Sequence, residues 1–288
     1  MKDRPLVSIV TPSYNQGDFI EDTILSIKNQ KYPSIEHIIV DANSTDQTHE
    51  IIRKYESDYR MVWIAEEDEG PADALNKGFR VASGSIYGYL NSDDLLLQSA
   101  VENIVDSFKS QPEKDVIYSN GFIIDKNNKI IKKVYSSPFY NPFLYLYGAI
   151  LILQQSSFWR CTVFEQVGGF NLANKTCWDG ELWLDISLAG GKFHKIPGFI
   201  GCLRHHKNSI TSKEHGGEKH IKDHNRMFRR LMNRNPNILD KIGKYFGRLG
   251  SKIIQPYNIF PKSFIKQAKV EVNRDTLKCY KNNQYRRG

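Results

Sequence analysis

Short apolar runs alternate with polar turns and amphipathic stretches along the first third of the chain. Residues 6–10 form an apolar run that enters a polar loop, and the spacing after it predicts an amphipathic helix over residues 18–30. Residues 36–41 and 61–65 repeat the pattern, each followed by turn residues and then a predicted helix. This alternation, with crossovers of this length, predicts an α/β fold with a doubly wound, mostly parallel sheet.

A fourth apolar run, residues 85–90, ends on an acidic pair. Asp93 and Asp94 follow it after two polar residues. Ligands of open α/β sheets bind outside the carboxyl ends of the strands, so the pair is expected at a ligand-binding edge. Carboxylates there suit Mg²⁺ or Mn²⁺, which bridge them to substrate phosphates. Asp94 is also consistent with an N-cap for a helix beginning near Leu95.

Polar motifs follow one another along the first half of the chain, at residues 8–15, 40–48, 68–70 with 76–78, and 91–94. In order and spacing they resemble those of the family 2 glycosyltransferases of the GT-A fold. Residues 154–160, 167–170 and 178–184 resemble the acceptor-binding half of the same family. The resemblance covers residues 5–211.

The resemblance implies a GT-A catalytic domain over residues 1–220, with a basic amphipathic helical extension over 221–288. Within it, residues 1–97 would bind the nucleotide-sugar and residues 98–220 the acceptor. The implied activity is metal-dependent inverting transfer of a sugar from a nucleotide-sugar, with UDP favoured, to a hydroxyl of a glycan or lipid-linked glycan. Surface polysaccharide biosynthesis, such as that of lipopolysaccharide or capsule, is the implied process.

Two other classes of protein are alternatives. One is a catalytically silent nucleotide-sugar-binding protein on the same fold, which the departures from the family motifs described below would suit. The other is a sugar-nucleotide pyrophosphorylase or nucleotidyltransferase. That class expects a Gly-rich, basic loop directly after the first strand, and residues 11–15 are not such a loop.

The family positions also imply a donor site. Asp41 would accept hydrogen bonds from the base or ribose, although a helix N-cap is its alternative role. Tyr14 would contact the base or merely pack, and Lys77 would pair with a phosphate or stay solvated. The donor-binding residues expected on these grounds are Thr11, Pro12, Ser13, Tyr14, Asp41, Asp68, Asn76, Lys77, Asn91 and Ser92.

The implied cofactor is a divalent metal, Mn²⁺ or Mg²⁺, because a cation offsets the charge that builds on a departing diphosphate. Asp93 is the first ligand expected and Asp94 the second. His206, in a motif that resembles the family's closing histidine, is a further candidate. The family motif is usually Asp-x-Asp, but Asn91 stands at its first position and brings no charge.

An acceptor hydroxyl needs a carboxylate base on the face opposite the leaving group. By resemblance the base is the aspartate before a Leu-Trp-Leu helical segment, which is Asp179, with Glu181 as the alternative. Trp178 and Asp185 stand where the family often has Glu and Arg, which indicates a differently shaped acceptor pocket.

Charge is distributed unevenly along the 288 residues, whose formal net charge is +8. Residues 1–220 hold 23 Lys and Arg against 28 acidic residues, whereas residues 221–288 hold 17 against 4. Apolar positions recur at helical spacing in the basic part. This is typical of a helix on an anionic membrane surface, or of a lid on the catalytic domain. No module that reads or stacks on bases is evident, so nucleic acid is not an expected partner.

The chain is expected in the cytoplasm, peripheral on the inner face of the membrane. Its most apolar stretch, residues 143–153, is about half the roughly 20 residues that span a bilayer, so we expect an acceptor-side wall or buried helix there. The first strand begins almost at once, which leaves no room for a signal peptide. Without metal-ligand spacing, reduced thiols are expected at Cys161, Cys177, Cys202 and Cys279.

Overall fold

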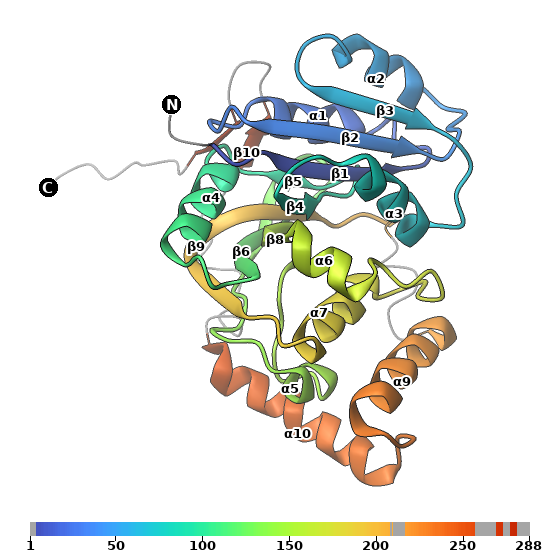
Figure 1. The fold of residues 1–288 in the computed structure, drawn as a ribbon, viewed down its shortest axis with the longest axis vertical. Helices are drawn as coiled ribbons and strands as arrows, with labels where there is room; N and C mark the ends of the chain where they lie inside the picture. Colours follow the sequence, from blue (N-terminus) through green and yellow to red (C-terminus); the bar gives the residue numbers. More distant parts are fainter. Residues whose placement is uncertain (1–3, 208, 210–216, 257–268, 273–276, 281–288) are drawn as a thin grey trace, which may run out of the picture.

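The computed structural model describes residues 4–207, 209 and 217–256, and the backbone of 269–272 and 277–280. Four strands of its first half pair in parallel in the order β3-β2-β1-β4. They are β1 (Val7–Ser13), β2 (Ile35–Asp41), β3 (Met61–Ala65) and β4 (Ile86–Tyr89). The helices between them are α1 (Ile20–Lys28), α2 (Thr48–Tyr55) and α3 (Pro71–Val81). The predicted α/β fold, with helices alternating with parallel strands, is confirmed (Figure 1).

The same sheet continues into the second half. Strand β8 (Ser157–Arg160) runs antiparallel to both β4 and β6 and joins the two halves. Beyond it lie β6 (Val116–Ile124), β9 (Phe193–Arg204) and β5 (Leu95–Leu96), with β7 (Ile130–Val134) paired to β6. The helical segments of this half are α4 (Ala100–Ser110), α5 (Pro142–Leu146), the 3₁₀ turn η1 (Gln154–Ser156), α6 (Cys161–Val167) and α7 (Trp178–Leu188).

Close packing between helix α3 and the sheet depends on a small residue. Pro71 occupies the start of α3, where its fixed φ suits a helix and its missing N–H costs nothing. Gly78 lies directly over Val10 of β1, and a Cβ on Gly78 would collide with that side chain. On the same side of the sheet, Phe79 packs against Tyr87 and Trp159, so the core spans both halves.

Two acidic residues do not have the capping roles considered for them. The helix expected near Leu95 is absent, because Leu95 and Leu96 form β5, which pairs with β9, and α4 begins only at Ala100. Asp94 therefore precedes a strand. Asp41 ends β2, and α2 begins seven residues later with Gln47 as its N-cap residue.

The C-terminal part begins with two helices, α9 (Glu218–Met232) and α10 (Ile238–Ile254). Met227 and Phe228 of α9 are buried against Leu184 of α7 and Leu146 of α5. The boundary expected after residue 220 thus falls inside a helix that packs on the catalytic domain. The part of the extension that the structure describes also contains β10 (Lys269–Val272) and β11 (Leu277–Tyr280), which form an antiparallel pair.

Residues 143–153 are only partly helical. Helix α5 ends at Leu146, and the segment after it is irregular up to η1. Within the described part of the chain, no helix is long and apolar enough to span a bilayer. Cys161, Cys177 and Cys202 are not joined in disulfide bonds, and the side chain of Cys279 lies outside the described residues.

Candidate active site

The carboxyl ends of three neighbouring strands meet at one edge of the sheet. Ser13 of β1 lies in register with Asp41 of β2, and β4, on the other side of β1, leads into residues 91–94. The loops after β1 and β2 are tied together: the Asn15 backbone N–H donates to Ser44 Oγ at 2.7 Å, and the Thr45 N–H donates to Asn15 Oδ1 at 2.9 Å. Two expected donor-binding regions and the acidic pair therefore share this edge, as the sequence predicts.

Asp93 lies beside a histidine from the other half of the chain. His206 Nε2 is 2.8 Å from Asp93 Oδ2, although 113 residues separate them in sequence. The His206 ring packs on Phe19, with 4.7 Å between the ring centroids. The structure thus brings together two of the three expected metal ligands, an oxygen and a nitrogen donor.

Asp94 is held inside the protein by uncharged donors. Its carboxylate accepts hydrogen bonds from the backbone N–H of Arg204 at 2.8 Å, the Gln155 side chain at 2.7 Å and the Asn91 side chain at 3.1 Å. Burial, and after it the charge of Asp93, raise the pKa of Asp94 well above its usual value. The hydrogen bonds of Asp94, including the one from Asn91, therefore fix the conformation of the loop that carries Asp93.

Arg204 organises this loop, and its role was not anticipated from the sequence. The side chain is fully buried, and its Nε donates to the backbone oxygen of Asp93 at 2.6 Å. Its guanidinium pairs with Asp22 of α1 at 3.1 Å and lies 5.0 Å from the Phe19 ring centroid. Arg204 is thus a buried bridge between the end of β9, α1 and the acidic loop.

Asp41 is buried in a hydrogen-bonded turn. It accepts from Ser44 through the backbone N–H at 2.8 Å and the hydroxyl at 2.6 Å. His49 Nε2 lies 2.6 Å from Asp41 Oδ2, the oxygen that also accepts from the Ser44 N–H, and the His49 ring stands edge-on to Trp63, with 4.9 Å between centroids. Sequence reasoning missed Ser44 and His49, which hold the carboxylate in one orientation.

The expected donor-binding residues of the β1 region divide into inward and outward positions. Thr11 is buried, and its hydroxyl is 2.9 Å from His37 Nε2, so it belongs to the core beneath the edge. The neighbouring Pro12 is buried as well. Ser13 is buried, yet its hydroxyl has no partner among the described residues. Tyr14 is 59% exposed. Ser13 and Tyr14 are thus the members of this loop with a side chain left for a ligand.

Asn76 and Lys77 of α3 have protein partners. Asn76 donates to the backbone oxygen of Phe170 at 2.8 Å and accepts from its N–H at 2.9 Å, which clamps α3 to the second half. Lys77 pairs with Glu66 at 3.2 Å and Asp73 at 3.3 Å. Asn76 is therefore a structural link rather than a free ligand group.

Two other expected donor-binding residues, Asp68 and Ser92, follow the strands β3 and β4 in the sequence. Asp68 accepts from the Gly70 N–H at 2.8 Å, and burial raises the pKa of its carboxyl group. Ser92, next to Asp93, is buried.

In the second half, α7 begins with Trp178 and Asp179. The Trp178 indole N–H donates to the Tyr89 hydroxyl at 3.0 Å, which fixes the first turn of α7 against the end of β4. Gly180 faces Tyr145, whose hydroxyl leaves no room for a Cβ there. Burial raises the pKa of Asp179, and the Asp179 charge is in turn the next cause, after burial, that raises the pKa of Tyr89 and Tyr145.

Asp179 differs from its neighbours in having no side-chain partner. Within the described residues no side chain pairs with its carboxylate, and the groups that lower its pKa are the backbone N–H groups of Gly180 and Asp179. The carboxylate is thus half-buried and is not neutralised by a cation. This is the environment that poises a carboxylate to accept a proton.

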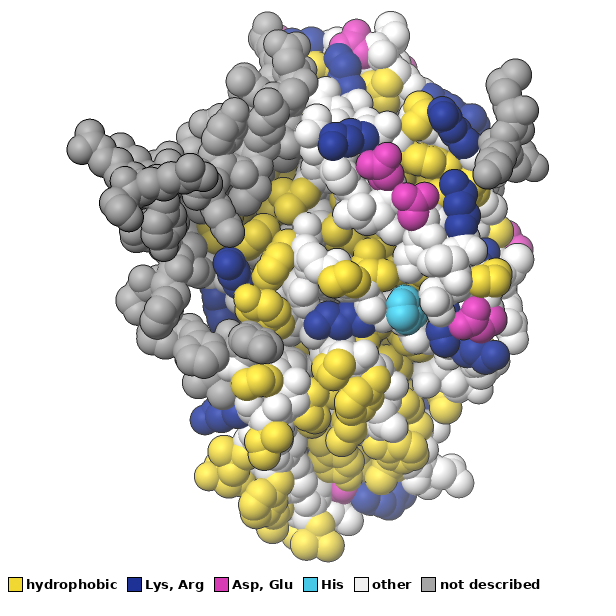
Figure 2. Space-filling model, turned by 90° about the vertical axis from the view of Figure 1, so that its left-hand side faces the viewer, with side chains coloured by type: hydrophobic (Ala, Val, Ile, Leu, Met, Phe, Trp, Pro, Cys, Tyr) yellow, Lys and Arg dark blue, Asp and Glu magenta, His cyan; other side chains and the backbone are white. Residues whose placement is uncertain are grey.

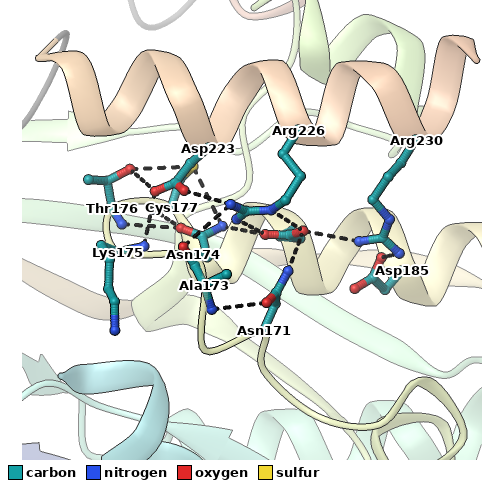
Figure 3. Close-up of polar contacts among 11 residues, drawn as sticks. Asn171, Ala173, Asn174, Lys175, Thr176, Cys177, Asp185, Asp223, Arg226 and Arg230 are labelled. Atoms are coloured by element: carbon teal, nitrogen blue, oxygen red, sulfur yellow. Dashed lines mark hydrogen bonds and ion pairs between the residues drawn. The ribbon is translucent and has the colours of Figure 1, made fainter. Parts of the chain in front are cut away.

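Glu181, two residues further along α7, is fully engaged (Figure 3). It is 1% exposed and accepts from Arg226 at 2.6 Å and Arg230 at 3.0 Å, both on α9. Asn174 donates at 2.7 Å and Asn171 at 3.0 Å. Burial alone would raise the pKa of Glu181, but the hydrogen bonds, of which that from Arg226 is the strongest, hold it below its usual value.

The network around Glu181 continues along α9. Arg230 also pairs with Asp185, and Arg226 pairs with Asp223, which accepts from Thr176 and Lys175 in the loop before α7 (Figure 3). Helix α9 therefore fixes both the loop and the helix that carry Asp179. A lid on the catalytic domain was one of the two alternatives for this basic segment, but the pairing of α9 with Glu181 and Asp185 was not predicted.

Comparison with known families decides the assignment. Residues 8–168 match the model of "Glycosyl transferase family 2", which is more than half of the chain. The chain belongs to glycosyl transferase family 2. The resemblance found in the sequence motifs is thus confirmed, and the matched region contains β1 to α6, including the acidic loop at the end of β4.

The family 2 chain is similar to longer curated proteins. It is 28% identical over 233 residues to the chondroitin synthase of Escherichia coli, a match that covers 80% of this chain and 34% of that protein. The match covers 34% and 37% of the length of two of these curated relatives and 58% of another, so the chain spans only part of each.

Solved structures support the GT-A fold. A segment of S. aureus TarS in complex with UDP-GlcNAc superposes with a TM-score of 0.65 at 16% identity, covering 86% of this chain and 72% of that one. The mannosyltransferase PcManGT from Pyrobaculum calidifontis, in complex with GDP-Man and Mn²⁺, gives 0.62 at 18% identity, covering 89% and 74%. At these identities the likeness shows the fold alone.

Proposed function

We propose that the protein is an inverting glycosyltransferase that moves a sugar from a nucleotide-sugar to a hydroxyl of a glycan or lipid-linked glycan. The observation that carries the proposal is Asp179, a half-buried carboxylate with a raised pKa and without a side-chain partner in the described chain. UDP is the favoured nucleotide. The similarity to chondroitin synthase, a polysaccharide enzyme by name, supports a role in surface polysaccharide assembly on the cytoplasmic side of the membrane.

Asp179 serves as the general base in this proposal. The acceptor hydroxyl donates its proton to a carboxylate oxygen of Asp179 as its own oxygen attacks the anomeric carbon. The bond to the diphosphate breaks on the opposite face, so an α-linked donor gives a β-linked product. Glu181 does not suit this role, because its carboxylate is already bound by two guanidinium groups and its pKa is lowered.

Asp93 and His206 are the residues that would hold a divalent metal. Their 2.8 Å contact offers one carboxylate oxygen and one imidazole nitrogen, a donor set that suits Mn²⁺, with the diphosphate of the donor as the remaining ligand. A bound cation would offset the charge on the leaving diphosphate. Asp94 is less suited, since its oxygens accept three protein hydrogen bonds in the interior.

The nucleoside would lie along the edge formed by the ends of β1 and β2. Asp41 would accept from the ribose or base with an orientation set by Ser44 and His49, and the unpartnered hydroxyl of Ser13 lies in register beside it. Exposed Tyr14 would contact the base. These groups come from one rigid sheet edge, which reduces the entropy lost on binding.

A catalytically silent nucleotide-sugar-binding protein is the second candidate. The observation that favours it is Asn91, which replaces a charged residue of the usual acidic motif and is turned toward Asp94. Such a protein would bind the donor through the same sheet edge. It would transfer no sugar under any acceptor condition.

The experiment that tests the proposal is a thermal-shift panel with UDP, GDP, CDP and dTDP, each with Mn²⁺, with Mg²⁺ and with chelator. A ligand that binds the native state raises the melting temperature. Stabilisation by one nucleotide only when metal is present supports the transferase proposal and names the donor class for an acceptor screen. Absence of a shift with every pair contradicts it. Hydrolysis or transfer of the matching sugar then separates an active enzyme from a silent binder.

A further inference from the structure

Helix α10 packs on the protein through its smallest residues. Gly243 and Gly247 face Tyr147, and a Cβ on Gly243 would come within 2.7 Å of the Tyr147 ring. At the start of the helix, Asp240 is buried and accepts from the Tyr147 hydroxyl at 2.7 Å and from Arg234 at 2.6 Å. These contacts fix which side of α10 faces the protein.

The side of α10 that faces away from the protein is apolar. A helix on a globular protein normally buries its apolar stripe and exposes its polar face. In α10 the order is inverted, and the helical spacing of the exposed apolar residues places them in one stripe. This outer stripe consists of Ile238, Ile242, Tyr245, Phe246, Leu249 and Ile253, each at least 40% exposed. Figure 2 shows hydrophobic side chains gathered on the lower part of the molecule, where Figure 1 places α5 and α10.

A basic row flanks the outer stripe. Lys241, Arg248 and Lys252 are exposed and follow one another at helical spacing along a single edge of it. Asp240 is the helix's one acidic residue, and it is buried against Arg234. The exposed surface of α10 therefore combines apolar side chains with positive charge alone.

We propose that α10 docks the protein on an anionic membrane, lying in the plane of the interface with the outer stripe among the acyl chains and the basic row among the headgroups. This combination fits a surface that is both apolar and negatively charged, as a bilayer rich in acidic lipid is. A second copy of the chain fits less well, because two basic rows would be brought together. No described helix could span the bilayer, so the attachment is peripheral.

The docking proposal is independent of the transfer reaction, since it concerns another face of the molecule and its test has no activity readout. The full chain is floated with vesicles of phosphatidylcholine alone and with vesicles rich in phosphatidylglycerol. Binding is expected only with the second kind, and it should weaken as salt is raised. Flotation with neither kind overturns the proposal.

Two variants separate the contributions of the outer stripe and the basic row. Ile242→Asp with Phe246→Asp should abolish flotation, because both side chains leave the acyl region and bring negative charge. Lys241→Glu with Arg248→Glu should reduce partitioning by at least roughly fivefold for each position. Both pairs lie on the exposed side, so melting temperatures should match that of the native chain.

Matched controls come from exposed residues elsewhere. Leu188 of α7 is 51% exposed, and Lys109 of α4 has a 52% exposed side chain. Leu188→Asp and Lys109→Glu should float like the native protein, and an equal loss in these controls overturns the proposal. Light scattering adds a second check. A dimer that Ile242→Asp with Phe246→Asp dissociates, without vesicle binding by the native chain, would assign the outer stripe to a second copy and overturn membrane docking.

Discussion

Each half of the molecule carries two acidic residues close together in sequence, and each half separates their roles by environment. At the end of β4, Asp94 is enclosed by uncharged donors while Asp93 faces His206. At the start of α7, Glu181 is enclosed by two arginines of α9 while Asp179 has no side-chain partner in the described chain. In both pairs one carboxylate holds the structure, and the other is the one to which we assign a chemical role in the proposed function.

The two enclosed carboxylates differ in the direction of their pKa shifts, and the difference shows what each does. Burial, and after it the charge of Asp93, raises the pKa of Asp94, whereas hydrogen bonds, that from Arg226 first, keep the pKa of Glu181 low despite burial. Glu181 is therefore an ionic anchor between α7 and α9, and Asp94 is a hydrogen-bonded corner of a loop. The residue type alone does not show whether a carboxylate forms an ion pair between helices, holds a loop by hydrogen bonds, binds a metal or accepts a proton.

Asp179→Asn gives the largest expected effect in this comparison. The amide cannot accept a proton, so the rate of sugar transfer should fall by roughly 10²- to 10⁴-fold. Donor affinity, measured by calorimetry with metal present, should be unchanged because the proposed donor contacts do not include Asp179. A variant with near-native turnover would remove the assignment of the base.

Glu181→Gln tests the enclosed member of the same pair. Removing the charge leaves Arg226 and Arg230 without their shared partner, and the loss of one member of a buried ion-pair network costs about 3–5 kcal/mol. The free energy of unfolding from urea denaturation should fall by this amount. Glu165→Gln, on the exposed surface of α6, is the matched control and should leave stability unchanged. Equal stability of the two variants would show that Glu181 is not an anchor.

Asp93→Asn should weaken the metal-dependent part of nucleotide binding by roughly tenfold, the size of one interaction with a charged group. The nucleotide is titrated into the protein once with Mn²⁺ and once with chelator, and the difference between the two binding free energies is the metal-dependent part. Asp106→Asn, whose side chain is 69% exposed on α4, should leave the difference unchanged. If native affinity is the same with metal and with chelator, the metal role of Asp93 and His206 is contradicted.

The smallest effect concerns the pH dependence of stability. Because the pKa of Glu181 is held below its usual 4.5, its ionised form stabilises the fold above that pH, and this contribution is lost as the pH falls through the lowered value. The stability difference between the native protein and Glu181→Gln should therefore be constant at neutral pH and shrink below about 4.5. Urea denaturation at a series of pH values gives the difference, and one that persists unchanged in acid would contradict the ionic role.

The strand ends of the first half were predictable because local pattern decides them. The runs that became β1, β2, β3 and β4 each lead to a polar loop, and parallel strands bring such loops to one edge. The contact of Asp93 with His206 followed from the family motif. What the sequence did not show were partners far apart in the chain, such as Arg204 with Asp22, and His49, whose role depends on the turn after β2.

The second half was less predictable for a physical reason. The pairing of Glu181 with Arg226 and Arg230 joins residues 45 and 49 positions apart across two helices, and no local spacing encodes that contact. A basic amphipathic segment is compatible with a lid on the catalytic domain or with a membrane contact. In the structure α9 packs on α5 and α7, and α10 carries the outer stripe. Leu95 and Leu96 form a short strand instead of a helix because they pair with the edge of β9.

The most direct test of the central claim, that Asp179 is the base and Glu181 is not, is the pH dependence of the transfer rate for the native protein and for Asp179→Asn. Burial raises the pKa of Asp179, so the native kcat should fall with decreasing pH through an apparent pKa above 3.8, while the fold, followed by tryptophan fluorescence, is intact. The residual rate of Asp179→Asn should show no such fall over the same range. The same acid limb in both proteins would mean that another group accepts the proton, and the account would be contradicted.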